Sequence, residues 1–207
     1  MSLLGALTPL GKVAGARKTW LMSALAYTLA GALSSTLVGA ALGSLGVWLQ
    51  QGQQRWPVLF GVALLAFCLA AREWGWLKFP IPQRKRQTER VWAHEFGFVG
   101  ASALWGFHIG LTFLTWVTYG GVWALAGACL ALADPLYGAT VMLAYWFGRT
   151  LPVWLAPMLN WSGSDGSQVS SDILSVPWLY HRLAGFGLVW SGGVVAWLAF
   201  EKLSGRS

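Results

Sequence analysis

The stretch from Trp20 to Leu49 reads WLMSALAYTLAGALSSTLVGAALGSLGVWL and carries no charged side chain. A helix rises about 1.5 Å per residue, and about 20 apolar residues cross a bilayer core of about 30 Å. A helix that is apolar on every face over such a length belongs in lipid rather than in water. We therefore expect a membrane-spanning helix here, tilted or extending beyond one face of the bilayer.

The rest of the chain has the same character. Hydrophobic residues make up 56% of its 207 positions and charged residues only 10%, whereas soluble domains carry about 25% charged residues. We predict an all-α polytopic membrane protein with about five or six transmembrane helices in a single domain, residues 1–207. The expected spans are residues 20–49, 57–76, 96–133, 136–159 and 177–200.

The apolar run from residue 92 to residue 133 is too long for one span and too short for two spans with a loop between them. Paired glycines interrupt it in the sequence Thr118-Tyr119-Gly120-Gly121. Unwound backbone at membrane depth is tolerated only where protein or a cavity surrounds it. We therefore predict a broken or re-entrant helix, whose break forms a candidate ligand site near the midplane together with Arg149.

Basic residues account for the net charge of +7 and for the predicted orientation. The loop at residues 78–95 holds five of the fourteen basic residues, so the positive-inside rule places it in the cytoplasm. This predicts a bacterial inner membrane or an organellar membrane. The polar stretch at residues 160–173 has no Lys or Arg and is expected outside, which favours a hairpin over a crossing for residues 92–133. Without a basic groove beyond that loop, we predict no nucleic-acid partner.

Short matches recur when the chain is displaced by about 105 to 107 residues, for example Leu29–Ala32 onto Leu136–Ala139. Such an offset favours an inverted repeat, an arrangement common in small transporters. Two GxxxG pairs and abundant Trp also suit helix-to-helix docking. The predicted docking glycines are Gly39, Gly43, Gly106 and Gly110.

Three motifs resemble the CcdA/DsbD transmembrane electron-transporter family of cytochrome c biogenesis. They are GFHIGLTFLT at residues 106–115, AYWFGRTLP at residues 144–152 and ALTPLG at residues 6–11. The resemblance implies a helical scaffold that moves reducing equivalents by thiol exchange. The positions that correspond to the family's redox cysteines are Leu10 and about Val117, which cannot be oxidised reversibly. The chain is thus identified as a degenerate member, a non-catalytic accessory or assembly subunit that docks to a larger respiratory or photosynthetic complex.

Two cysteines leave a redox alternative open. Cys68 and Cys129 lie among Leu, Ala and Phe, surroundings that disfavour a reactive thiolate and indicate core residues. If they nevertheless form a pair, the protein is a transmembrane thiol–disulfide electron transporter. A small-solute transporter with its site at residues 118–121 and Arg149 is the third possibility.

The three histidines are His94, His108 and His181. His94 and His108 are fourteen residues apart, which in a regular helix puts them near one face and about 21 Å apart. Two bis-imidazole cofactors would need four histidines, so we predict no cofactor, with single haem or chlorin ligation as the alternative. No catalytic triad and no HExxH or CxxC spacing is present, which argues against a metal site and an ordinary enzyme.

Overall fold

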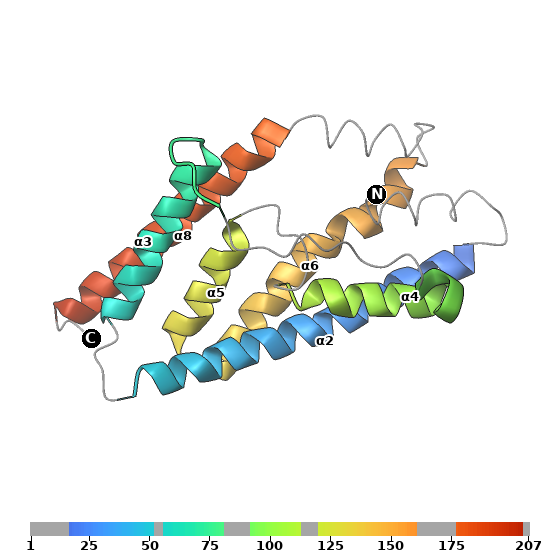
Figure 1. The fold of residues 1–207 in the computed structure, drawn as a ribbon, viewed down its shortest axis with the longest axis horizontal. Helices are drawn as coiled ribbons and strands as arrows, with labels where there is room; N and C mark the ends of the chain where they lie inside the picture. Colours follow the sequence, from blue (N-terminus) through green and yellow to red (C-terminus); the bar gives the residue numbers. More distant parts are fainter. Residues whose placement is uncertain (1–16, 52–55, 81–91, 113–119, 161–176, 205–207) are drawn as a thin grey trace. The chain divides into compact units, whose positions relative to one another are not determined.

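The computed structural model of the chain describes residues 17–51, 56–80, 92–112, 120–160 and 177–204. Throughout these residues the backbone forms α-helices joined by turns, and no strand occurs among them, which confirms the predicted helical class. Figure 1 shows the helices in chain order. They are α2 (Arg17–Leu49), α3 (Trp56–Glu73), α4 (Trp92–Gly110), α5 (Gly121–Leu132), α6 (Pro135–Asn160) and α8 (Pro177–Leu203).

Three of the described helices are long and apolar enough to cross a membrane. They are Lys18–Leu49 in α2, all of α3, and Ala184–Glu201 in α8. The predicted count of five or six spans is not supported. Helix α5 has only 12 residues, a length of about 18 Å. Helix α6 has 26 residues but includes Arg149 and several Tyr, Trp and Pro residues, which lower its hydropathy.

The apolar run from residue 92 to residue 133 is divided between two helices. Helix α4 ends at Gly110 and α5 begins at Gly121; Thr118 and Tyr119, two residues of the predicted break, lie outside the described residues. Helix α4 is itself kinked at Gly97, whose φ of 64° and ψ of 175° are not helical. A positive φ of this kind is open to glycine without steric strain. The described part of the run, residues 92–112 and 120–133, therefore holds two helices, the first of which is bent.

The described residues fall into two compact units, whose boundaries lie inside α2 and α6. The first unit contains α2 up to Ser35, helix α4, and α6 from Ala144 onward. Its core is Ala24, Tyr27, Trp146 and Val153. Thr28 joins its helices, because the Trp146 Nε1–H donates to the Thr28 carbonyl at 2.8 Å and the Trp154 Nε1–H donates to the Thr28 hydroxyl at 3.0 Å.

The second unit contains α2 from Thr36, helices α3 and α5, α6 up to Leu143, and α8 from Trp178. Helices α3 and α5 pack side by side in it. The core residues come from α3, α5 and α8, and are Ala66, Leu69, Ala70, Ala124 and Leu188. Most of them are small, so the three helix backbones lie close together.

Glycines bring helices together within both units. A Cβ added to Gly39 would overlap the carbonyl oxygen of Gly138 on α6, and one added to Gly43 would overlap the carbonyl oxygen of Asp134. In the first unit, Gly106 lies in the same way against the Tyr27 carbonyl. A Cβ on Gly110 would overlap the Ser34 hydroxyl and the Gly31 carbonyl. All four predicted docking glycines thus lie against helices of this chain, while docking to another protein stays a prediction.

Candidate functional site

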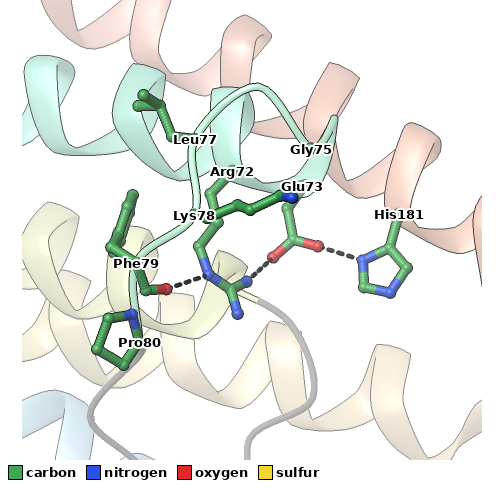
Figure 2. A pocket seen from close by; sticks show the side chains of 8 residues that line it. All are labelled: Arg72, Glu73, Gly75, Leu77, Lys78, Phe79, Pro80 and His181. Atoms are coloured by element: carbon green, nitrogen blue, oxygen red, sulfur yellow. Dashed lines mark hydrogen bonds and ion pairs between the residues drawn. The ribbon is translucent and has the colours of Figure 1, made fainter.

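A buried carboxylate lies at the C-terminal end of α3, in the second unit. The Glu73 side chain is fully buried, and its Oε1 accepts the Arg72 Nη1–H at 3.0 Å and the Gly120 backbone N–H at 2.9 Å. Its other oxygen contacts Nδ1 of His181 from α8. Figure 2 shows the Arg72 guanidinium and the His181 ring on opposite sides of this carboxylate. Glu73 therefore joins the end of α3 to α8 and to the residue before α5.

The local fold at this point follows from a glycine. Gly75 has a φ of 81°, the left-handed conformation in which helices commonly end at glycine. The Trp76 N–H donates to the Ala71 carbonyl at 2.8 Å, and the Gly75 N–H donates to the Arg72 carbonyl at 2.9 Å. These are the two hydrogen bonds of a Schellman motif. The chain then turns back over the helix end, where the Phe79 carbonyl accepts the Arg72 Nε–H at 3.0 Å.

A pocket of about 570 Å³ opens beside this carboxylate. The Arg72 side chain is 25% exposed and the His181 side chain 39% exposed, while that of Glu73 has no exposed surface. The pocket is lined by Arg72, Glu73, Gly75, Leu77, Lys78, Phe79, Pro80 and His181. The two basic side chains, Arg72 and Lys78, are therefore open to a ligand, and the Glu73 carboxylate is buried.

This arrangement suits binding better than metal chemistry. A carboxylate that contacts one imidazole nitrogen fixes the ring orientation and directs the other nitrogen away from it. Among the described residues, however, no group of three or more His, Cys, Asp or Glu side chains could hold a metal ion. Both oxygens of Glu73 are already engaged, so the carboxylate is not open to a cation. The charged groups that face the pocket, on Arg72 and Lys78, are hydrogen-bond donors.

The predicted ligand site at residues 118–121 contributes one backbone group to this cluster. The Gly120 N–H donates to Glu73, and Gly121 begins α5. Arg149 lies elsewhere, in the first unit, where it is exposed on α6 and donates to the Tyr145 hydroxyl at 3.0 Å. A joint role of Gly120, Gly121 and Arg149 stays a prediction.

The cysteines and the other histidines lie outside the cluster. Cys68 is half-buried on α3, and Cys129 is buried on α5, where its thiol donates to the Gly138 carbonyl at 3.7 Å. Both thiols are free, and their redox pairing stays a prediction. His108 is half-buried on α4, and the His94 side chain lies outside the described residues. Because the kink at Gly97 separates His94 from His108, their spacing does not place them on one face.

Sequence reasoning missed Glu73, Arg72 and Lys78 as site residues. The signal was available for Arg72 and Glu73, because both lie within the predicted span 57–76 and an ionisable residue inside a membrane span is a functional candidate. His181 was named, but as a cofactor ligand and without its carboxylate partner.

Comparison with known proteins finds relatives described as methylamine utilization protein MauF. The chain is 28% identical over 153 residues to the protein of Methylophilus methylotrophus, and likewise to that of Methylobacillus flagellatus; each alignment covers 73% of this chain and 54% of the relative. It is 27% identical over 191 residues to the protein of Methylorubrum extorquens, covering 89% of this chain and 61% of the relative. The chain thus spans between half and two thirds of the length of these relatives. No family model and no solved structure matches it.

These findings correct the family interpretation. The resemblance to the CcdA/DsbD electron transporters, and the role in cytochrome c biogenesis that it implied, are wrong, because the matching relatives carry the MauF name. The physical reason lies in the motifs. Short runs of Gly, Ala, Leu and Thr recur in any apolar helix, and Leu10 and Val117 stand where the redox cysteines would have been required.

Proposed function

We propose that this chain is an integral membrane accessory protein of methylamine utilisation. The observation that carries the proposal is the similarity to the MauF proteins of several organisms, which extends over 73 to 89% of the chain. The name of those proteins states a role in methylamine utilisation and no catalytic step. An accessory role fits the described residues, where the polar groups serve helix contacts and one pocket.

The experiment that tests this role is deletion of the gene in its own host. We expect growth on methylamine to be lost, growth on succinate to be unchanged, and a plasmid copy to restore growth on methylamine. The native host is preferable to a MauF-deficient strain of another species, because the chain covers only 54 to 61% of the relatives' length. Growth of the deletion strain on methylamine at the wild-type rate would exclude the proposed role.

The proposal also covers α4 and α6, which are not among the three helices long and apolar enough to cross a membrane. Helix α4 contacts α2 through Gly106 and Gly110, and α6 contacts it at Thr28 in one unit and at Gly39 in the other. Helices that lie along a membrane-spanning helix in this way lie at the same depth. We therefore place α4 and α6 in the bilayer beside α2. Because Lys and Arg are in excess after α3, we also propose that the Lys78 end of α3 faces the cytoplasm.

An accessory protein also needs a partner, and we propose another membrane protein. Purification of the tagged native protein in mild detergent, with mass spectrometry and an absorption spectrum of the same sample, tests this. Stoichiometric recovery of one further membrane protein from methylamine-grown cells is expected. A protein recovered alone under several mild detergents would count against a stable complex, and haem or chlorin bands would make the histidines cofactor ligands.

A further inference from the structure

We propose that the pocket at the end of α3 binds the phosphate group of an anionic phospholipid. This proposal goes beyond methylamine utilisation and depends only on α3 crossing the bilayer. It rests on three features of the pocket: the hydrogen-bond donors that remain open in it, the covered state of its negative groups, and its position at the end of an apolar helix.

The open donors come from Arg72 and Lys78. A guanidinium group has five N–H bonds, and the described residues engage two of those on Arg72, one with Phe79 and one with Glu73. The remaining three, including both on Nη2, have no partner among the described residues. These two contacts hold the guanidinium in one orientation against the pocket, and Lys78 adds an exposed ammonium group. A fixed planar donor group beside an ammonium group suits a phosphate.

The negative groups nearby are covered. Both carboxylate oxygens of Glu73 are engaged, by Arg72, Gly120 and His181. Three of the last four carbonyls of α3, those of Ala70, Ala71 and Arg72, lie at the negative end of the helix dipole and accept the backbone N–H groups of residues 74 to 77. The lining contains two basic side chains and one carboxylate, so its formal charge is positive even with His181 neutral. An anion is therefore attracted to this lining, where the one carboxylate is buried and both of its oxygens are engaged.

The position of the pocket indicates which anion. Helix α3 has 18 residues, which span about 27 Å and bring its ends to the edges of the hydrocarbon layer. The segment that follows is aromatic, and the Trp76 side chain is 75% exposed, as expected at the level of the lipid headgroups. Leu64 and Phe67 are exposed about two turns or less before the pocket and can contact acyl chains. A lipid phosphate lies at this depth, and basic pockets at the cytoplasmic face are known binding sites for such headgroups.

The test is native mass spectrometry of the full chain, purified in mild detergent and mixed with equal amounts of phosphatidylglycerol and phosphatidylcholine. We expect the wild type to retain one phosphatidylglycerol, and Lys78→Gln to retain about fivefold less, as follows from the contribution of one basic residue near an anionic lipid. Lys18→Gln is the matched control, because Lys18 is an exposed lysine at the start of another spanning helix. It should retain phosphatidylglycerol like the wild type.

Two further arms keep the test decisive. Lys78→Glu should lose more phosphatidylglycerol than Lys78→Gln, with the helical circular dichroism spectrum unchanged because Lys78 is exposed outside the helices. Inorganic phosphate in large excess should not displace the lipid.

The proposal is overturned if both Lys78 variants retain phosphatidylglycerol like the wild type, or if phosphatidylcholine is retained equally. If inorganic phosphate displaces the lipid, the ligand of the pocket is a free phosphate ion and the proposed lipid site is wrong. If the deletion strain grows normally on methylamine but the purified protein retains phosphatidylglycerol, the lipid site is supported and the role in methylamine utilisation is excluded.

Discussion

Glu73 shows how a charged side chain is accommodated inside a helical protein of low polarity. Moving a carboxylate out of water is costly unless hydrogen bonds and opposite charge compensate it. Here the compensation comes from the preceding residue, from a backbone N–H 47 residues away, and from an imidazole 108 residues away. Removal of the carboxylate charge therefore affects three segments at once.

Replacement of Glu73 by glutamine tests this. Glutamine keeps the shape and one acceptor oxygen but loses the ion pair with Arg72, which leaves a half-buried guanidinium without its counter-charge. We expect the free energy of unfolding to fall by about 3 kcal/mol, measured by thermal or denaturant unfolding in detergent. Glu95→Gln is the control, because Glu95 is an exposed glutamate in the first turn of α4. Equal stability of the two variants would show that the cluster contributes nothing to folding.

Thr28 has a comparable role in the first unit. Its hydroxyl donates to the Ala24 carbonyl at 2.8 Å and accepts the Trp154 Nε1–H at 3.0 Å. Thr28→Val has nearly the same shape but leaves that indole N–H without its acceptor, so we expect a loss of about 1 to 2 kcal/mol in unfolding free energy. Thr140→Val is the matched control, since that exposed hydroxyl bonds only within its own helix. A larger effect at residue 140 than at residue 28 would contradict the assignment.

At the scale of the element, helix α6 is positioned by its first residues and by one glycine. Asp134 Oδ1 accepts the N–H groups of Leu136 and Tyr137 at 2.7 and 3.1 Å, the pattern of an N-cap, with Pro135 at the first helical position. One turn later, Gly138 lies against Gly39 of α2. The cap fixes where α6 begins, and the glycine pair fixes how closely it approaches α2.

The two glycines of α6 provide an internal comparison. A side chain on Gly138 would overlap the Gly39 carbonyl, whereas one on Gly148 meets nothing within 4 Å. Gly138→Leu should separate α6 from α2 and lower the free energy of unfolding by about 2 kcal/mol or more. Gly148→Leu should leave stability unchanged or raise it slightly, because leucine favours helix more than glycine does. Similar unfolding temperatures for the two variants would refute the close contact.

The helical class was predictable from the sequence, because a long apolar stretch in lipid must pair its backbone N–H and C=O groups internally and an α-helix does so. Local signals were also present: Asp134 directly precedes α6, which begins at Pro135, and Gly75 lies just after α3. The Glu73 cluster was not predictable, because nothing in one sequence pairs Glu73 with Gly120 or His181 across 47 and 108 positions. The predicted count of five or six spans is not supported, because only three of the described helices have the length and hydropathy of a spanning helix.

For the whole molecule, the helices that cross the bilayer determine which segments face each compartment. Helix α3 is the clearest element for a test, because its 18 residues are long and apolar enough to cross a membrane and its charged residues, Arg72 and Glu73, lie at one end. Gln51 precedes it and Lys78 follows it, and both are exposed. If α3 crosses the bilayer, these two positions must face opposite compartments, wherever the other helices lie.

Single cysteines at these two positions measure that directly. In a background with Cys68 and Cys129 replaced by alanine, a membrane-impermeant maleimide should label Gln51→Cys in intact cells and Lys78→Cys only in inverted membrane vesicles. This orientation follows from the excess of Lys and Arg after α3, which the positive-inside rule assigns to the cytoplasm. The reverse labelling would keep the crossing but invert the orientation, and would move the phosphate pocket to the opposite leaflet. Labelling of both positions from the same side would mean that α3 does not cross, and the pocket would then lose the position from which its lipid ligand was inferred.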